Sequence, residues 1–336
     1  MKYRAYGKTG WSVSEIGFGA WGLGGDWGPV DDEHSIQTLL AAWDWGINLV
    51  DTAQMYGKGH SEEVIGQALK LWTGDHIYVA TKVQPVQWPH PSEGNPMLEG
   101  LYPRDYVRKQ CESSLTRLGV ETIDIYQLHG WFPRGVEETE WYTVLDELKQ
   151  EGKIRTIGVS IRDYRPEDGI AIAQSGMVET EQVVYNIFEQ RPADRLFPAC
   201  QKYGVAVLAR VPFDESSLTG TWTKDTYDSW APYDVRRPYF KGERFGHTLA
   251  KVEAIKQVVK QITGDRYSGL AEVALRFCLA NPAISCVIPG MMNLEQLESN
   301  ITASDGEALP DELLKQLKMF NWPRNYHNPD EEVDPE

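Results

Sequence analysis

Four side chains with acid–base chemistry stand at or just beyond the ends of three apolar segments of the sequence. They are Asp51 and Tyr56 in INLVDTAQMYG, Lys82 in IYVATK and His129 in IDIYQLH. In a parallel barrel the C-terminal ends of the strands meet at one face, and that face carries the active site. A carboxylate, a phenol, an ammonium and an imidazole gathered there predict proton transfer coupled to hydride transfer at a carbonyl.

Reduction of a carbonyl creates an alkoxide, which needs a proton donor that acts near neutral pH. The phenol of Tyr56 is a weak acid, with an ordinary pKa of about 10. We expect Lys82 to lower that pKa by stabilising the phenolate, and Asp51 to keep Lys82 charged and oriented. His129 is expected to hydrogen-bond the carbonyl oxygen and to assist the proton transfer. Taken singly, each residue also has a structural interpretation, as a packed tyrosine, a solvated lysine, a turn cap or a core histidine.

Strand-like apolar segments alternate with amphipathic segments along most of the chain. This alternation, with near-continuous apolar strands, predicts a parallel sheet that helices cover on its outer side. Eight such units predict an α/β fold that closes as a (β/α)8 TIM barrel. The expected strands are residues 15–19, 47–53, 76–82, 123–129, 154–160, 180–186, 204–210 and 284–289. The expected helices are residues 32–45, 61–72, 103–118, 138–151, 166–175, 193–203, 248–262 and 268–280.

Other segments complete the expected architecture. Residues 2–11, with their KTG turn, predict an N-terminal β-hairpin. Two long connections, 84–102 and 211–246, are expected on the C-terminal face of the barrel as lids or pocket walls. We expect a single barrel domain over residues 1–320 and a loosely packed, acidic, Pro-rich C-terminal tail over residues 321–336.

The composition excludes several classes of function. A formal net charge of -16 leaves no basic stripe for a phosphate backbone, so we expect no nucleic-acid partner. The sequence has no apolar run of signal-peptide or membrane-spanning length, which predicts a cytoplasmic protein without a membrane partner. Its four cysteines are scattered without CxxC spacing, which indicates reduced thiols and no metal site.

Several motifs, in this order and spacing, resemble the aldo-keto reductase family from Tyr3 to about Leu317. They are GINLVDTAQMYGKGHSEEVIGQAL, VATK, IDIYQLH, EGKIRTIGVS, EQVVYN, SSLTG and VIPGMMNLEQLESN. The resemblance implies a (β/α)8 barrel that binds a nicotinamide dinucleotide in extended form without a Rossmann fold. It also implies that Tyr56 is the general acid in reduction and the general base in oxidation.

The segment GFGAWG at residues 17–22 has the spelling of the Rossmann fingerprint GxGxxG. That fingerprint requires a helix to open on the glycines, so that its N-terminus meets the pyrophosphate. Here helix formation begins only near Asp31. We therefore interpret the segment as the first barrel loop.

The resemblance assigns Ser160 and Gln182 to the carboxamide of the nicotinamide. Two positions depart from the family pattern, because Ile161 replaces the usual Asn and Arg210 replaces a Tyr that commonly stacks on the nicotinamide. A planar guanidinium can also stack on a ring and would add positive charge beside the cofactor. The alternative is that Arg210 binds a loop carboxylate.

The stretch after the eighth expected strand bears on the choice between NAD and NADP. Relatives that prefer NADPH place cationic or hydroxyl side chains there, since a 2′-phosphate needs charge-assisted hydrogen bonds. This chain instead has Gly290, Met292 and Gln296, which predicts that NAD is tolerated or preferred. Gln296 and Asn300 are expected to contact the adenine. The alternative is a cation from another loop, supplied by Arg210, Lys224 or Arg244.

Aromatic residues on the expected upper loops predict the substrate pocket. They are Trp21, Trp27, Trp88, Trp131, Trp222 and Trp230. Such rings provide apolar walls and stack on the CH faces of sugars, although Trp-rich loops also bury their own rings.

We therefore expect an NAD(P)-dependent oxidoreductase for a sugar, a polyol or a small aldehyde or ketone. One alternative is a cofactor-sensing barrel subunit that binds a partner protein with little turnover, resembling those of potassium channels. Another is a lyase with a Schiff base on Lys82, which Asp51 disfavours by keeping the amine charged.

Overall fold

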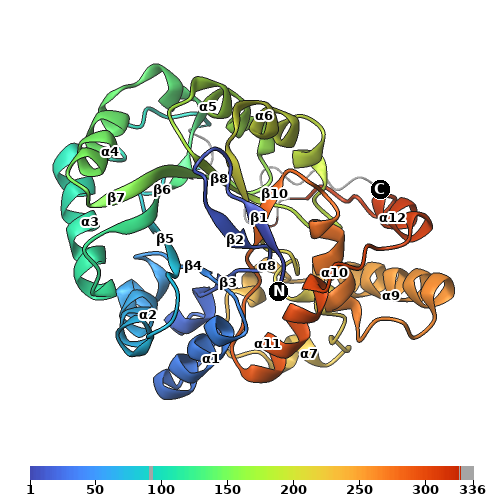
Figure 1. Ribbon diagram of the computed structural model, residues 1–336. Coiled ribbons are helices and arrows are strands. Elements are labelled where there is room, and N and C mark those ends of the chain that lie inside the picture. The colour runs from blue at the N-terminus through green and yellow to red at the C-terminus, as the bar shows by residue number, and fades with distance from the viewer. Residues whose placement is uncertain (91–93, 325, 327–336) are drawn as a thin grey trace.

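A computed structural model describes residues 1–90, 94–324 and 326 of the chain. Eight parallel strands form one sheet, in which every strand lies beside its neighbour in the sequence. Isolated parallel bridges join Ile16 to Val287 and Gly19 to Gly290, so the first strand also meets the last. Figure 1 shows the helices arranged around the outside of this ring. The predicted (β/α)8 barrel is confirmed.

The barrel strands are β3 (Phe18–Gly19), β4 (Leu49–Asp51), β5 (Tyr78–Val83), β6 (Ile123–Trp131), β7 (Ile154–Ile161), β8 (Thr180–Val184), β9 (Ala206–Arg210) and β10 (Ile284–Val287). The helices that alternate with them are α1 (Asp32–Asp44), α2 (His60–Leu71), α3 (Arg104–Leu118), α4 (Glu140–Gln150), α5 (Gly169–Ser175), α6 (Leu196–Tyr203), α9 (Glu243–Thr263) and α10 (Leu270–Leu279). Four further helices were not predicted: α7 (Thr226–Ser229), α8 (Arg236–Tyr239), α11 (Leu294–Ile301) and α12 (Asp311–Lys318). The first two belong to the long connection after β9, and the last two follow β10.

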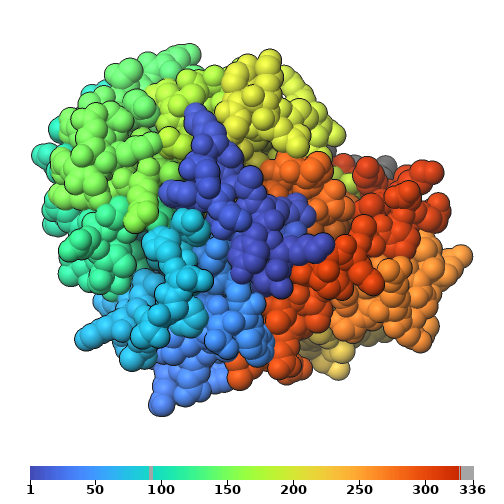
Figure 2. Space-filling view, viewed as in Figure 1, coloured from blue at the N-terminus to red at the C-terminus, as the bar shows by residue number. Residues whose placement is uncertain are grey.

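The predicted N-terminal hairpin consists of β1 (Tyr3–Ala5) and β2 (Ser12–Ser14), which pair antiparallel. Tyr6 and Val13 are buried against barrel residues at the starts of several strands. Thr180 Oγ1, at the start of β8, donates a hydrogen bond to the Tyr6 hydroxyl at 3.0 Å. Figure 2 shows the N-terminal segment, in dark blue, covering the centre of the face in view. The hairpin thus closes the N-terminal end of the barrel, and the opposite end carries the functional loops.

Local sequence signals explain where several helices begin and end. Asp31 caps α1 by accepting a hydrogen bond from the His34 amide at 3.1 Å, so the GFGAWG segment opens no helix. Instead β3 and a short 3₁₀ turn, Trp21–Gly24, occupy that segment. Gly119 ends α3 in the left-handed conformation, which a residue with a Cβ adopts only with strain.

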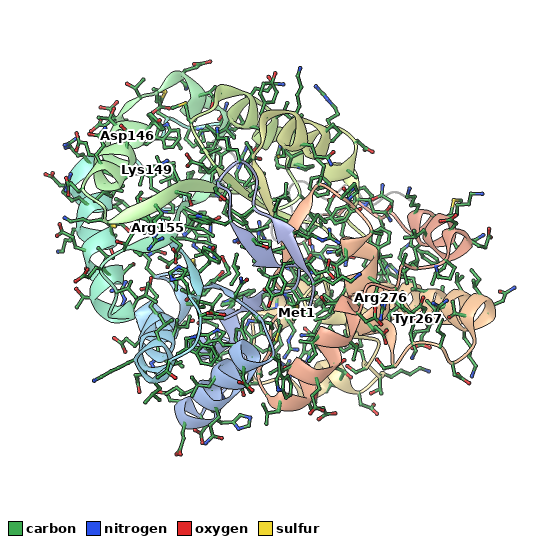
Figure 3. All side chains as sticks on the ribbon, in the orientation of Figure 1. Met1, Asp146, Lys149, Arg155, Tyr267 and Arg276 are labelled. Carbon is green, nitrogen blue, oxygen red and sulfur yellow. The ribbon has the colours of Figure 1, made fainter. Side chains whose placement is uncertain are left out.

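The region after β10 is fastened to α10 by a buried arginine. Arg276 donates to Asp305 at 2.7 Å and to the Thr302 carbonyl at 2.9 Å. Its guanidinium lies 5.6 Å from the ring centre of Tyr267, and Figure 3 shows the two side chains near one another. This fastening holds the segment after α11 against the barrel.

The described part of the expected tail is packed against the body of the protein. Trp322 and Arg324 are both buried, so the expectation of loose packing from residue 321 onward is wrong for these two residues. Residues 325 and 327–336 of the expected tail lie outside the described residues. All four cysteines are buried, and none of them forms a disulfide bond. Within the described residues, no helix is both long enough and apolar enough to cross a membrane.

Candidate active site

The four acid–base side chains predicted from the sequence lie together at the C-terminal ends of β4, β5 and β6. Lys82 is fully buried, and its Nζ donates to Asp51 Oδ1 at 2.6 Å and to the Thr52 carbonyl at 2.7 Å. The same Nζ lies 3.4 Å from the Tyr56 hydroxyl. The His129 ring lies edge-on to the Tyr56 ring, with centroids 5.9 Å apart. The carboxylate, the cation, the phenol and the imidazole therefore form a chain in which each group lies next to the following one.

The position of Tyr56 depends on a close approach of two backbone segments. Gly57 has a φ of 58°, and a Cβ there would lie 2.3 Å from the Gly24 carbonyl oxygen. A Cβ on Gly24 would in turn lie 2.6 Å from the Gly57 nitrogen. The first barrel loop therefore rests directly on the turn that carries Tyr56. The Trp21 ring, from the same loop, stacks on the Tyr56 ring at 6.0 Å.

The electrostatics of Tyr56 differ from the sequence-based expectation. Burial raises the pKa of Tyr56 above its ordinary value of 10, and the Asp51 carboxylate raises it further. The ammonium of Lys82 acts in the expected direction and lowers the pKa, but burial outweighs it. The expected net decrease is therefore wrong, because Tyr56 lies in a desolvated site. At neutral pH the phenol is protonated, with a cation placed to stabilise its phenolate.

His129 lies in an environment that keeps its imidazole neutral. Burial lowers its pKa well below 6.5, and the charges of Lys82 and Arg210 lower it further. Its Nδ1 is buried and has no hydrogen-bond partner in the part of the chain that the structure describes. Trp88 lies edge-on to the imidazole, with ring centroids 6.0 Å apart. A neutral imidazole carries one N–H group, with which it can hydrogen-bond a carbonyl oxygen.

A cavity of about 1450 Å³ opens above these side chains. Tyr56, His129 and Asp51 are part of its wall, while Lys82 lies behind them. Both long connections contribute to the lining, through Trp88 to His90 and through many residues between 211 and 236. The predicted site residues that line the cavity are Trp21, Trp27, Trp88, Ser160, Gln182, Arg210, Gly290, Met292, Gln296 and Asn300.

The residues expected at the nicotinamide lie side by side on β7 and β8. Ser160 is paired in register with Gln182, and Gln182 Nε2 donates to Asp51 Oδ2 at 2.7 Å. Arg210 lines the cavity, yet its Nη2 also donates to Asp163 Oδ1 at 2.6 Å. The interpretation of Arg210 as a partner of a loop carboxylate is confirmed, and its stacking on the nicotinamide stays a prediction.

The wall formed after β10 contains no cation between residues 290 and 302, and it carries acidic residues at Glu295 and Glu298. The expected adenine contacts also have structural duties. Gln296 Oε1 accepts a hydrogen bond from the Met292 amide at 2.8 Å. Asn300 Nδ2 donates to the Gly290 carbonyl at 3.3 Å. These two hydrogen bonds tie the segment between β10 and α11 to α11 itself.

Two of the cations considered for the 2′-phosphate, Arg244 and Lys224, lie away from this wall. Arg244 donates to the carbonyls of Tyr239 and Tyr326. Lys224 is exposed. Neither is among the residues that line the cavity.

Trp131 does not line the cavity, so its assignment to the substrate pocket is wrong. Strict alternation along β6 would place it on the same side as His129. The register shifts between Leu128 and Trp131, which turns the indole outward. Trp131 is fully buried against Trp141, and its Nε1 donates to the Asp168 carbonyl at 3.0 Å.

Two lining residues escaped the sequence analysis because they lie in the long connection after β9. Arg236 is held between the rings of Trp27 and Trp230, at 4.9 and 4.8 Å from their centroids. Glu215 is buried, and burial together with the neighbouring Asp214 raises its pKa to about 8. Trp222 and Trp230 of this segment were expected at the pocket and line it, but no periodicity placed Arg236 or Glu215.

The donors and the volume of the cavity fit a nicotinamide dinucleotide. Cavities for small molecules usually span about 300 to 1,000 Å³, so this one has room for a dinucleotide and a second molecule. Ser160 and Gln182 offer hydrogen-bonding groups beside Tyr56, as a carboxamide requires. His129 lines the same cavity, so its imidazole can meet a substrate oxygen there.

Comparison with known proteins agrees with this geometry. The profile of the Aldo/keto reductase family matches residues 15–321. An aldo-keto reductase of Bacillus subtilis is 33% identical over 304 residues, covering 89% of this chain and 87% of the relative. An NADH-specific methylglyoxal reductase of Escherichia coli is 31% identical over 320 residues, covering 90% and 93%. The solved structure of a glycerol dehydrogenase from Gluconobacter oxydans superposes with a TM-score of 0.76 at 29% identity, covering 95% and 94%.

Proposed function

Because this chain belongs to the aldo/keto reductase family, we propose that it interconverts a small carbonyl compound and its alcohol, with Tyr56 as the residue that transfers the proton. Enzymes of this family are oxidoreductases that act on carbonyl and alcohol groups with NAD(P)(H). The observation that carries the proposal is the position of the Tyr56 hydroxyl at the cavity wall, 3.4 Å from the buried ammonium of Lys82.

Each member of the tetrad has a distinct role in this proposal. The bound dinucleotide supplies or accepts the hydride. In reduction, Tyr56 gives its proton to the developing alkoxide, and Lys82 stabilises the phenolate that remains. Asp51 holds Lys82 in place through their 2.6 Å contact. His129, neutral at physiological pH, donates a hydrogen bond to the substrate oxygen.

We infer a preference for NAD over NADP from the wall after β10. A 2′-phosphate placed beside residues 290 to 302 would meet no cation there and would lie near Glu295 and Glu298. Burial of an unpaired phosphate costs several kcal/mol, whereas a ribose hydroxyl can use neutral partners. Gly290, Met292, Gln296 and Asn300 are the residues that we propose around the adenosine.

The substrate is proposed to be a sugar, a polyol or a small aldehyde or ketone. Trp21, Trp27 and Trp88 form aromatic walls around Tyr56 and His129. Such walls stack on the CH faces of polyols and exclude water from the reacting carbon. Two similar proteins are, by their names, a methylglyoxal reductase and a glycerol dehydrogenase. The cytoplasmic location stays a prediction from the sequence.

A substrate panel tests the proposal. We expect sugars, polyols and small carbonyls, assayed in both directions with NAD(H) and NADP(H), to include substrates that change the absorbance of the reduced nicotinamide. A cofactor-sensing subunit would bind the dinucleotide but turn over none of the panel. A lyase would instead leave a substrate fragment attached to Lys82 after borohydride treatment. Either result would contradict the reductase assignment.

A further inference from the structure

The loop after β9 contains a strained turn that forms part of the cavity wall. Asp214, Glu215 and Ser216 have φ values of 48°, 51° and 74°, although none is a glycine. Left-handed conformations are strained for residues other than glycine, because the Cβ crowds the backbone. Glu215 and Ser216 line the cavity. Such strain persists only where the surroundings enforce it, so the contacts of this turn, residues 214–216, identify what enforces it.

An arginine near the end of the described chain provides the main restraint. Arg324 Nη2 donates to Asp214 Oδ2 at 2.5 Å, across 110 residues of sequence. Both side chains are almost completely buried. Ser217 Oγ donates to the same carboxylate oxygen at 2.6 Å. On the cavity side, Arg236 Nη1 donates to Ser216 Oγ at 3.1 Å.

Aromatic rings fix the guanidinium of Arg324 in turn. It lies 4.1 Å from the ring centroid of Trp322, 4.9 Å from Phe188 and 5.0 Å from Tyr326. Within the described residues, its Nε and Nη1 have no hydrogen-bond partner. A buried cation with so few hydrogen bonds is costly. Among the described residues, its one polar contact is the carboxylate of Asp214 in the strained turn.

The turn lies where an extended dinucleotide must pass. In the ring of strands, β9 lies between β8 and β10. The residues proposed for the nicotinamide are on β7 and β8, and those proposed for the adenosine follow β10. A cofactor that spans the two groups crosses the loop of β9, which includes the 214–216 turn.

We propose that Arg324 is a positioning residue for cofactor binding, because its buried ion pair with Asp214 holds the 214–216 turn in its strained, cavity-facing conformation. This inference rests on the proposed function. Without the ion pair the turn relaxes, and only the fraction of molecules with the strained turn binds the dinucleotide. The apparent dissociation constant rises by the inverse of that fraction.

The test compares Arg324→Met, Arg324→Lys and Arg4→Met with the unaltered protein. Arg4 binds the buried Glu15 at the hairpin end of the barrel, far from the cavity, so its loss is a matched structural control. Dissociation constants for NADH and NADPH are measured by fluorescence titration, together with thermal midpoints and steady-state kinetics. For Arg324→Met we expect weaker dinucleotide binding by about tenfold or more, with kcat at saturating cofactor within about threefold.

The controls separate positioning from general stability. Arg324→Lys retains the charge that pairs with Asp214 but loses the stacking of the guanidinium on the rings, so it should restore only part of the affinity, whereas Arg4→Met should lower the thermal midpoint and leave the affinity unchanged. Unchanged affinity in folded Arg324→Met would overturn the inference. If Arg324→Met does not fold, the neutral double variant Asp214→Asn/Arg324→Gln is decisive, because it leaves no buried charge unpaired. Failure of the unaltered protein to bind either dinucleotide would instead overturn the proposed function.

Discussion

At the scale of single residues, Tyr56 combines two opposing influences. Burial raises its pKa and Lys82 lowers it, with burial the stronger. A neutral phenol at physiological pH is the form that a reductase requires, because it must hold a proton until the alkoxide forms. The cation is most useful after the transfer, when it faces a phenolate. The desolvated position of Tyr56 therefore agrees with a general acid whose conjugate base is stabilised by Lys82.

The choice of cofactor can be tested at Gly290. This residue is exposed, and a Cβ added there would meet no atom within 4 Å, so Gly290→Lys places a cation at the cavity wall without a clash. We expect the ratio of kcat/KM for NADPH to that for NADH to rise by about tenfold, as one charge-assisted contact would give. Parallel kinetics with both cofactors measure that ratio.

Gly246→Lys serves as the control for Gly290→Lys. Gly246 lies on α9 outside the cavity lining and also has open space around it. The substitution Gly246→Lys adds the same charge, and it should leave the ratio of kcat/KM for NADPH to that for NADH unchanged. An unchanged ratio in Gly290→Lys would mean that the phosphate is recognised elsewhere.

The sequence predicted most of this site, since alternation placed Asp51, Lys82 and His129 at strand ends. Two residues show where such reasoning fails. Trp131 was misplaced because a register shift in β6 reverses the alternation that the sequence implies. Arg324 was missed because its partner, Asp214, is 110 residues away, and nothing in the local pattern of either segment connects them.

At the scale of elements, the contact between β8 and α5 contains an unusual acid. Glu181 is fully buried, and both of its carboxyl oxygens lack a partner within the described residues. A Cβ on Gly169, the first residue of α5, would lie 2.4 Å from Glu181 Oε2. Burial raises the pKa of Glu181 well above its ordinary value. This carboxyl therefore weakens the packing of α5 and α6 on the barrel.

Replacement of Glu181 by Met should stabilise the protein. The folded state holds the Glu181 proton more tightly than the unfolded chain, whose glutamates titrate near a pKa of about 4.3. As pH rises above that value, the unfolded state releases its proton first, so the wild-type free energy of unfolding falls. We expect Glu181→Met to add about 1 to 3 kcal/mol at neutral pH, and the gain should increase from pH 5 to pH 8. Urea denaturation at each pH measures it.

Glu62→Met is the matched control for Glu181→Met. Glu62 is an equally buried carboxylate, but it accepts hydrogen bonds from Thr81 and Arg117 at 2.6 Å each. Its replacement should destabilise the protein, because it leaves the buried Thr81 hydroxyl and the partly buried Arg117 guanidinium without their acceptor. Destabilisation of the protein by Glu181→Met to the same degree would contradict the prediction. It would mean that the Glu181 carboxyl makes stabilising hydrogen bonds in the folded protein.

At the scale of the whole molecule, the two ends of the barrel have different roles: one end is closed by packing and the other end carries the candidate active site. The hairpin closes one end through Tyr6 and Val13, and the loops at the other end surround the cavity. The repeated alternation of apolar and amphipathic segments made this architecture predictable. The helices α7 and α8 were not predictable, because four-residue helices carry no periodicity. The burial of Trp322 and Arg324 was not predicted, because the tail that follows them has a polar composition, which indicates loose packing.

The most direct test of the account is the turnover of Tyr56→Phe, measured with a substrate found in the panel. The variant removes one hydroxyl and leaves Lys82, Asp51 and the cavity walls in place. We predict that NADH binds within about threefold of the wild-type affinity, while kcat falls by about 10²-fold or more, the usual contribution of a general acid. Wild-type turnover in this variant would contradict the assignment of Tyr56 as the proton donor.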